Sequence, residues 1–305
     1  MNEEIIKNKI SNFQTDAQLL CKQIEDFIRD SMKNLKRNGA VIGLSGGLDS
    51  AVTAALTVRS LGKENVHLLY MPEKDSNPIH REHVKRLADH LGIHLNIYNI
   101  SSIIKAARTY KILPLGLIPG RKLRTVVVEF GMEKLLKHND ERILIDRLEP
   151  EEDSWLAKGN SYGMTKHRIR MVVIYQFAEL RNLMVIGAAN RTELLTGTFS
   201  QWGIDHCADI MPVLHVYRSQ LEEIAEYINV PDYIRNKPSD PDLFPATLNK
   251  GTMLGRFQIA DHILYNMENN IDRNELHKVY DNKIVDHLFS LHESSMHMRK
   301  SPYHL

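Results

Sequence analysis

The sequence has few cysteines, and this scarcity excludes two kinds of architecture. Its 305 residues include only Cys21 and Cys207. Two cysteines cannot form a framework of several disulfides, and they do not make a cysteine-based zinc site. A reducing compartment fits this composition, so the sequence predicts a cytoplasmic protein.

A strong excess of charge and long hydrophobic runs are also missing. The formal net charge is +1, so no strong field points to nucleic acid or to an anionic membrane. The first ten residues are polar and charged, unlike a signal peptide. No apolar run reaches the roughly 18 residues that a membrane-spanning helix needs. We therefore expect neither nucleic acid nor a membrane as a partner.

What the sequence does contain is an alternation of strands and helices. Apolar runs typical of strands occupy residues 40–44, 66–71, 95–100 and 183–187, and helical patterns occupy 48–61, 79–91, 166–181 and 219–228. This alternation predicts an α/β fold, a doubly wound parallel sheet with helices on both faces. We expect one domain over residues 1–305, with an N-terminal helix at 3–37, an insertion, lid or oligomer arm at 101–158, and C-terminal helices at 256–268 and 273–291.

The loop after the first predicted strand carries the clearest chemical signal. It reads Ser45-Gly46-Gly47-Leu48-Asp49-Ser50 and lies between a strand and a helix. A strand, a glycine turn and a helix start direct backbone N–H groups and the positive helix end at one point, which suits an anion such as pyrophosphate. Asp49 beside phosphate oxygens is tolerable mainly as a ligand of Mg²⁺.

The loop lacks the lysine of a Walker A motif, so the sequence does not predict a P-loop NTPase. It resembles the SGGxDS loop of the ATP pyrophosphatases, which belong to the adenine nucleotide alpha hydrolase-like superfamily and cleave ATP to AMP and pyrophosphate. This resemblance implies a Rossmann-like sheet of the ATP pyrophosphatase type, with ATP at the carboxyl ends of strands 40–44 and 66–71.

Across residues 20–260 the chain resembles the ammonia-dependent NAD⁺ synthetases, and the resemblance fails through about 101–155. That family uses ATP to adenylate the carboxylate of deamido-NAD⁺, and ammonia then displaces AMP to form the amide. The resemblance implies an enzyme, a carbon–nitrogen ligase with Mg²⁺ as cofactor and ATP as co-substrate. It also implies a homodimer. Residues 1–39 are too short for a glutaminase domain, so we expect the chain to use free ammonia or ammonia from a separate partner.

The resemblance assigns roles to individual residues. Asp49 and Glu193 match the metal ligands and, with Arg218, make up the expected catalytic set. Arg218 stands where the family has a lysine that contacts ATP. The implied ATP-binding residues are Ser45, Gly46, Gly47, Asp49, Ser50, Arg170, Arg218 and Ser239. The implied residues for the dinucleotide are Arg168, Gln201, Asp209 and His297.

Each assignment has a plainer alternative. Glu193 could be an acid favoured at a helix N-terminus, and Asp209 could be a turn or cap residue. Arg168 and Arg170 could be surface arginines; they lie two positions apart and so cannot share one helix face. His297 could belong to a disordered tail.

The chain departs from the family mainly on the side of the carboxylate substrate. Gln201 stands where the family has a substrate-binding lysine, Ile204 replaces an aspartate, and Met298 replaces a lysine. Residues 249–255 lose an acidic family pattern, and Ala188 stands where many members have an ATP-contacting threonine. Three interpretations follow: deamido-NAD⁺ amidation, amidation of another carboxylate, or a non-catalytic nucleotide-binding subunit. A pure binder does not need both Asp49 and Glu193, which argues against the third.

Overall fold

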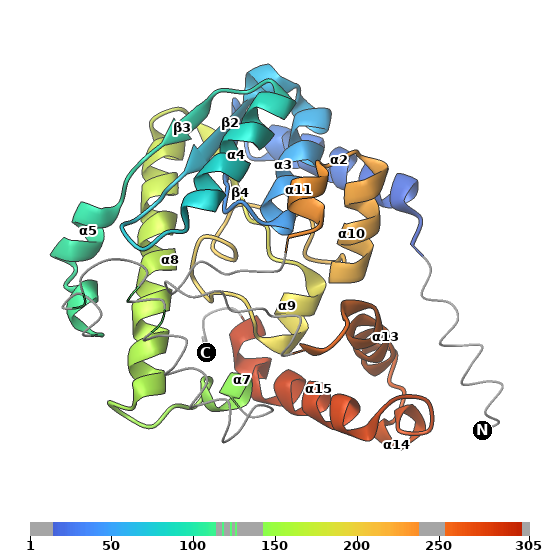
Figure 1. Cartoon of the computed structure of the whole chain (residues 1–305). Helices are drawn as coiled ribbons and strands as arrows, with labels where there is room; N and C mark the ends of the chain where they lie inside the picture. Colours follow the sequence, from blue (N-terminus) through green and yellow to red (C-terminus); the bar gives the residue numbers. More distant parts are fainter. Residues whose placement is uncertain are drawn as a thin grey trace.

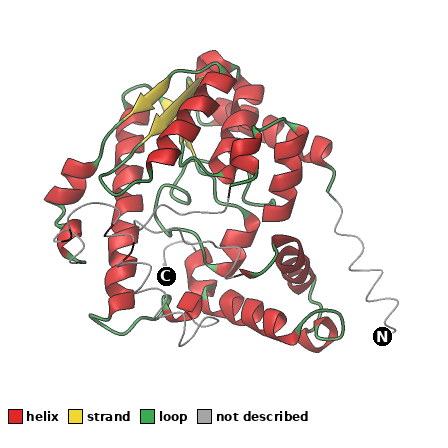
Figure 2. Ribbon diagram, viewed as in Figure 1, coloured by secondary structure: helices red, strands yellow, loops and turns green. Residues whose placement is uncertain are grey.

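A computed structural model describes residues 15–113, 118, 123, 126, 143–237 and 254–300 of the chain. Its centre is a four-stranded sheet of β1 (Gly39–Gly43), β2 (Val66–Tyr70), β3 (Leu95–Ile97) and β4 (Leu183–Ile186). All neighbours pair in parallel: Ala40 lies opposite Val66, Leu68 opposite Leu95, and Gly39 opposite Leu183. The predicted parallel sheet is confirmed (Figure 2).

The strand order, β3-β2-β1-β4, decides where a ligand can bind. The chain adds β2 and β3 on one side of β1 and later returns to add β4 on the other side. The loops that follow β1 and β4 therefore diverge at the carboxyl edge, and in doubly wound sheets ligands bind at this point of reversal. The sequence loop at 45–50 follows β1, and Glu193 follows β4.

Helices cover both faces of the sheet, as predicted. On one face α2 (Ala17–Asn34), α3 (Leu48–Leu61), α4 (Pro78–Leu91) and α10 (Arg218–Tyr227) pack in one core with Ile42, Leu68 and Ile186. On the other face α5 (Ser101–Ala106) and the long helix α8 (Trp155–Glu179) pack on Val41, Leu69 and Val185. Strand residues alternate between these two cores because successive side chains point to opposite faces. Figure 1 shows α8 on the opposite side of the sheet from α3.

A second apolar cluster lies beyond the carboxyl edge of the sheet. It joins α7 (Ile143–Asp146), α13 (Phe257–Glu268), α14 (Arg273–Leu276) and α15 (Asn282–Ser294), and Leu195 and Tyr217 also belong to it. Leu195 comes from α9 (Arg191–Thr196), the helix that carries Glu193. The C-terminal helices thus pack directly on an element of the candidate site (Figure 1). The short helices α11 (Asp232–Arg235), η1 (Lys63–Asn65), η2 (Thr109–Lys111) and η4 (Met296–Arg299) complete the described elements.

Three predicted boundaries were wrong. Helix α8 begins at Trp155, eleven residues before the predicted start at 166, because its first half buries Tyr162, Gly163 and Lys166, which make no apolar stripe. The predicted helix at 273–291 is divided into α14 and α15, since Asp281 caps a new helix by accepting from Lys283 N and Ile284 N. Strand β3 ends at Ile97 instead of at residue 100.

Parts of two predictions lie outside the described residues. The N-terminal helix is described from Ala17, so the predicted positions before residue 15 lie outside, as does most of 114–142 within the expected insertion. Among the described residues, no helix has both the length and the apolar character to cross a membrane.

Candidate active site

The loop between β1 and α3 has the geometry of an anion cradle. Gly46 has a φ of +77°, and a Cβ there would lie 3.2 Å from the Cα and the carbonyl oxygen of His80, so glycine fits best at this position. The hydroxyl oxygens of Ser45 and Ser50 lie 3.1 Å apart and close the turn. Gly47 is the N-cap of α3, and no side chain caps the helix by accepting from its first-turn N–H groups. These N–H groups can therefore bind an anion.

Asp49 is the residue at which three elements meet. Its Oδ2 accepts from Arg218 Nη1 at 2.9 Å, and its Oδ1 accepts from Asn190 Nδ2 at 2.9 Å. Asp49 is in the first turn of α3, Asn190 is the N-cap of α9, and Arg218 begins α10. Three helix N-termini therefore converge on one carboxylate, and their positive ends favour negative charge here.

Arg218 is held from both its backbone and its side chain. Its N–H donates to Thr192 Oγ1 at 2.9 Å, and its Nε lies 3.4 Å from Glu222 Oε1. Burial alone would lower the pKa of the Arg218 guanidinium. The carboxylates of Asp49, Glu222 and Glu193 outweigh burial and raise this pKa above its usual value. The group is therefore a fixed, buried cation in the middle of the cluster.

Glu193 lies in the first turn of α9, close enough to Arg218 to affect its pKa. Asn190 Oδ1 caps the helix by accepting from Glu193 N at 2.9 Å. The same amide donates to Asp49, so Asn190 links the two acids that the sequence analysis assigned to a metal. In the described part of the chain no group of three or more His, Cys, Asp and Glu side chains could hold a metal ion. A metal here would need ligands from a bound substrate in addition to Asp49 and Glu193.

A second cation reaches the loop. Lys237 Nζ donates to the carbonyl oxygen of Gly46 at 3.1 Å. Lys237 follows α11, which packs against α3, and this packing brings its ammonium group to the anion cradle. Lys237 is absent from the site residues predicted from the sequence.

The two arginines of α8 point to different places, as their spacing predicts. Arg170 Nε donates to Met71 O at 3.1 Å, at the carboxyl end of β2. Arg168 is exposed, and its Nη2 lies 3.4 Å from the carbonyl oxygen of Gln201. Arg170 thus lies on the side expected for the nucleotide, and Arg168 lies beside the segment 199–206.

The structure places the remaining predicted residues unevenly. Asp209 lies at the edge of β4, where Oδ2 accepts from Val185 N at 2.8 Å and Oδ1 accepts from Tyr175 OH at 3.2 Å, so its carboxylate holds a turn. His297 is exposed on η4, with Nδ1 3.0 Å from Ser294 O. Ser239 lies outside the described residues.

The segment 199–206 differs from the family pattern and is built around apolar and aromatic contacts. Ile204 packs over the end of β1: a Cβ on Gly43 would lie 2.5 Å from Ile204 Cδ1. The His206 ring lies between Phe199 and Trp202, with centroid distances of 4.6 and 5.6 Å. Burial lowers the pKa of His206, so the imidazole is neutral near pH 7. An aspartate in place of Ile204 would have to enter an apolar contact.

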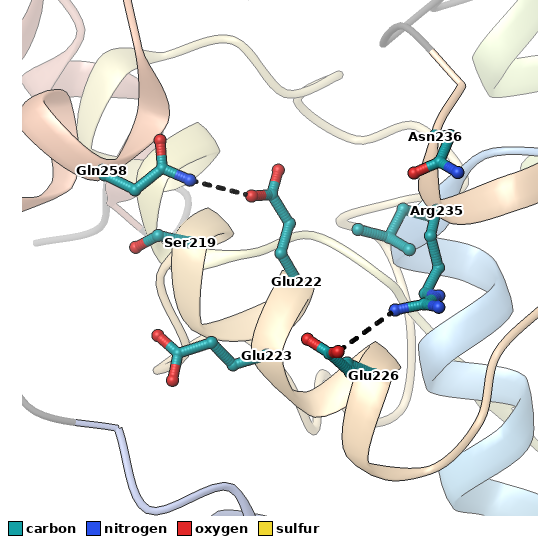
Figure 3. Close-up of a pocket in the computed structure, with 8 residues that line it drawn as sticks. Ser219, Glu222, Glu223, Glu226, Arg235, Asn236 and Gln258 are labelled. Atoms are coloured by element: carbon teal, nitrogen blue, oxygen red, sulfur yellow. Dashed lines mark hydrogen bonds and ion pairs between the residues drawn. The ribbon is translucent and has the colours of Figure 1, made fainter. Parts of the chain in front are cut away.

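A cavity of about 320 Å³ lies beside α10, and Figure 3 shows the residues that line it. Glu222 lines it and accepts from Gln258 Nε2 at 3.2 Å and from Arg218 Nε. The other lining residues are Leu48, Ser219, Glu223, Glu226, Arg235 and Asn236. Neither Asp49 nor Glu193 lines this cavity, so we place the chemistry at the convergence of helices instead.

Comparison with known proteins settles the family. A model of the NAD synthase family matches residues 20–113 and 124–302. The chain belongs to the NAD synthase family. The match leaves out only 114–123 between its two parts, so the expectation that the resemblance fails through about 101–155 was too broad.

Individual relatives of the NAD synthase family cover four fifths of the chain or more. The NH(3)-dependent NAD(+) synthetase of Coprothermobacter proteolyticus is 29% identical over 93% of this chain and 96% of its own length. That of Thermotoga neapolitana is 35% identical over 81% of this chain and 83% of its own. Among solved structures, the NH3-dependent NAD synthetase of Campylobacter jejuni, in complex with the nitrate ion, has a TM-score of 0.68 at 27% identity and covers 96% and 100% of the two chains. An NMN synthetase from Francisella tularensis has a TM-score of 0.70 at 23% identity and covers 96% and 99%, which shows a common fold.

Sequence reasoning missed three contributors to the site of this family member: Asn190, Lys237 and a buried Thr192–Asp261 contact. Asp261 Oδ1 accepts from Thr192 Oγ1 at 2.6 Å, and Oδ2 accepts from Ser219 N at 2.7 Å, which fixes the starts of α9 and α10 to α13. Asn190 could have been found, because an Asn followed three residues later by Glu is an N-terminus signature. Asp261 gives no such local signal, since its partners are remote in the sequence.

Proposed function

We propose that this chain is an ammonia-dependent NAD⁺ synthetase. Its reaction converts deamido-NAD⁺, ATP and ammonia into NAD⁺, AMP and pyrophosphate. Members of the NAD synthase family are carbon–nitrogen ligases, and relatives over four fifths of the chain or more are NH(3)-dependent NAD(+) synthetases. The structural observation that carries the proposal is the convergence of Asp49, Asn190 and Arg218 beside the anion cradle.

The arrangement suits adenylation of a carboxylate. A carboxylate is a poor electrophile, and transfer of the adenylyl group to it creates a good leaving group while pyrophosphate departs. The N–H groups of the loop at 45–50 bind phosphate oxygens, and Arg218 and Lys237 supply positive charge as the pyrophosphate charge develops. Since Arg218 is already fixed by Thr192 and Glu222, little reorganisation accompanies the reaction.

Asp49 and Glu193 would hold Mg²⁺ together with phosphate oxygens of ATP. Both offer oxygen ligands at helix N-termini, and Mg²⁺ prefers one or two carboxylates supplemented by phosphates and water. When bound, Mg²⁺ neutralises charge on the departing pyrophosphate. Asp49 already accepts from Arg218 and Asn190, so these two side chains fix the orientation of the carboxylate.

The carboxylate substrate is assigned to the region between α8 and the segment 199–206. Arg168 lies there beside the backbone of Gln201, and His297 from the C-terminal segment is the third candidate. Loss of a lysine at 201 removes one charge-assisted contact, which is worth about 1.5–3 kcal/mol. Together with Ile204 on the end of β1, this loss keeps a second candidate open: amidation of a different carboxylate, such as nicotinate mononucleotide.

Pyrophosphate release and NAD⁺ formation test the proposal together. Purified protein receives ATP, Mg²⁺ and ammonium, with deamido-NAD⁺, with nicotinate mononucleotide, or with neither. Release that requires deamido-NAD⁺ and matches NAD⁺ formed is the expected result. Equal efficiency with the mononucleotide, or a preference for it, would transfer the assignment to the second candidate. ATP binding without amide formation from either carboxylate would contradict both.

Ammonium and glutamine are compared in the same assay. We expect ammonium to support the reaction and glutamine to be inactive, because none of the proposed groups is a nucleophilic cysteine paired with a base. A homodimer and a cytoplasmic location remain predictions.

A further inference from the structure

A network of buried polar groups lies outside the residues assigned to the reaction. Lys166 Nζ donates to Glu73 Oε1 at 2.6 Å, and both side chains are fully buried. Glu73 Oε2 accepts from Tyr110 OH at 2.8 Å and from Asp75 N at 3.1 Å. Tyr162 OH donates to Asp75 Oδ2 at 2.8 Å, and the Lys166 ammonium lies 4.1 Å from the centre of the Tyr162 ring. Three separate parts of the chain are thus joined: the loop after β2, η2 and α8.

The network lies directly behind the nucleotide side of the candidate site. It holds the segment 71–80, which begins at the carboxyl end of β2 and leads into α4. At one end of this segment Met71 O accepts from Arg170, one helical turn from Lys166. At the other end His80 lies against Gly46 of the anion cradle, where an added Cβ would approach to 3.2 Å. The position of the segment therefore determines the wall next to the phosphate-binding loop.

Stability alone does not explain a buried ion pair at this position. Removing two charges from water costs about as much as their attraction returns, and apolar side chains of similar volume are often equally stable. Burial lowers the pKa of Lys166, while Glu73 opposes this effect. The directional contacts do, however, give the segment one defined position, because Glu73 and Asp75 each accept from a tyrosine hydroxyl fixed on another element.

We propose that Lys166 is a positioning residue for the nucleotide: through Glu73, it sets the segment 71–80 against the anion cradle and so determines the affinity for ATP. The inference rests on the proposed function in that ATP is the ligand. It predicts a selective effect, because the segment held by the network ends at His80 beside the anion cradle, whereas Arg168 lies against the backbone of Gln201.

Two variants test the network without leaving Lys166 or Glu73 as a buried charge that has lost the other. The double variant Lys166→Met with Glu73→Gln removes both charges at similar volume, and Tyr162→Phe removes only the hydroxyl that donates to Asp75. Affinity is measured by titration calorimetry with ATP and Mg²⁺ in the absence of a carboxylate substrate. KM values for ATP and deamido-NAD⁺ are measured in parallel.

Two control variants separate positioning from loss of stability. Val173→Ala removes a buried contact of α8 outside the network and lowers the melting temperature. Glu179→Gln removes the charge that pairs with Arg37 at the far end of α8, where Glu179 Oε1 lies 3.4 Å from Arg37 Nη2. We expect both control variants to keep the wild-type Kd for ATP within twofold.

The expected result is a Kd for ATP at least tenfold weaker in the double variant and about threefold to tenfold weaker in Tyr162→Phe. The KM for deamido-NAD⁺ should change less than threefold. Wild-type ATP affinity in Tyr162→Phe and in the folded double variant would overturn the inference, as would an equal loss in Val173→Ala. If the double variant does not fold, Tyr162→Phe decides alone. Wild-type protein that binds ATP but forms no NAD⁺ would overturn the proposed function, and the ATP affinities of the variants would then decide this inference. Wild-type protein that does not bind ATP would overturn both.

Discussion

At the scale of single residues, the Asp49 carboxylate joins the start of α3 to the starts of α9 and α10. It lies beside the anion cradle, accepts from Arg218 and Asn190, and is assigned to Mg²⁺. Asp49→Asn keeps the shape and removes the charge. We expect kcat/KM for NAD⁺ formation to fall by about 10²-fold or more, since a metal contributes several kcal/mol of charge stabilisation. Initial rates over a range of Mg²⁺ concentrations provide the measurement.

The same substitution at Asp26 is the matched control for Asp49→Asn. Asp26 is an exposed helical aspartate paired with Lys22 at 2.7 Å, and exposed pairs contribute little. Asp26→Asn should retain the wild-type rate and Mg²⁺ dependence. An Asp49→Asn enzyme with near wild-type rates would refute the metal assignment.

Asp261 gives a prediction on pH. Burial raises the pKa of this carboxyl from 3.8 to about 6, although Thr192 and Ser219 donate to it. Between about pH 4 and pH 6 the folded state therefore binds more protons than the unfolded state, so this group makes stability fall as pH rises. At 1.36 kcal/mol per pH unit the effect amounts to roughly 3 kcal/mol.

Urea unfolding of wild type and Asp261→Asn at pH 4.5, 5.5 and 7 measures this effect. The asparagine does not titrate, so the free energy of unfolding of wild type minus that of the variant should decrease as pH rises. Parallel pH profiles would show that Asp261 keeps an ordinary pKa. Only the difference is interpreted, because other groups titrate in both proteins.

How well single residues could be predicted depends on whether their role is local. The loop at 45–50 is contiguous, and the structure gives it the predicted turn, with Gly46 in the left-handed region. Asn190 and Lys237 reach the cluster only through the fold, because their partners are 141 and 191 positions away in the sequence. Asp209 and Ile204 take part in contacts with β4 and with Gly43 that no local pattern reveals.

At the scale of elements, the N-terminus of α9 couples helix capping to chemistry. Asn190 accepts from Glu193 N with one amide atom and donates to Asp49 with the other. Asn190→Ala should cost about 1 kcal/mol of stability and lower activity by about tenfold or more. Asn190→Asp keeps the cap oxygen but loses the donor and brings a second carboxylate to Asp49, so it should lower activity with a smaller loss of stability.

Thermal unfolding and initial rates of both Asn190 variants are compared with those of Asp16→Ala. Asp16 caps α2 by accepting from Leu19 N at 2.9 Å, away from the sheet edge. That variant should lose similar stability and keep its activity. Equal activity losses in Asn190→Ala and Asp16→Ala would mean that the α9 cap acts only through stability.

Elements with apolar periodicity were predicted well, and those with polar burial were not. The cores of β1, β2, β4, α3 and α4 agree with the predicted ranges to within about two residues. The first half of α8 was missed because Tyr162 and Lys166 are buried in polar contacts with Asp75 and Glu73, which are distant in the sequence. A fully buried lysine is rarely expected from a sequence, since burial is stable only with its partner in place.

At the scale of the whole molecule, strand alternation predicted the class of fold, and one topological fact places the site. The order β3-β2-β1-β4 brings the loops after β1 and β4 to the same edge. The two predicted metal ligands follow these two strands, so both carboxylates lie near Arg218 although 144 positions separate residues 49 and 193. Packing of α13 and α15 on α9 was beyond sequence reasoning, because an amphipathic helix does not reveal which apolar partner it will cover.

The predicted homodimer gives a test that uses the complete molecule. The C-terminal segment is anchored beside Glu193: Arg299 Nη1 donates to Leu195 O at 2.9 Å, and Met298 is buried against Leu194 and Phe199. His297 lies between these anchors and Ser294 and remains exposed. The resemblance to the ammonia-dependent NAD⁺ synthetases implies that His297 reaches the substrate of the second subunit, and we predict this role. We expect a particle of twice the 35.1 kDa chain mass in sedimentation equilibrium.

Mixed dimers can show whether His297 acts across the interface. Asp49→Asn and His297→Ala chains are each expected to be weakly active alone. In a mixed dimer, the site with an intact Asp49 would receive an intact His297 from its partner, so one of the two sites would be complete. Unfolding and refolding the two chains together pairs subunits at random, which makes about half of the dimers mixed. About a quarter of wild-type activity should therefore be restored. If His297 acts within its own subunit, mixing restores nothing, since neither chain holds both residues. Activity restored without a dimer in sedimentation would contradict both alternatives.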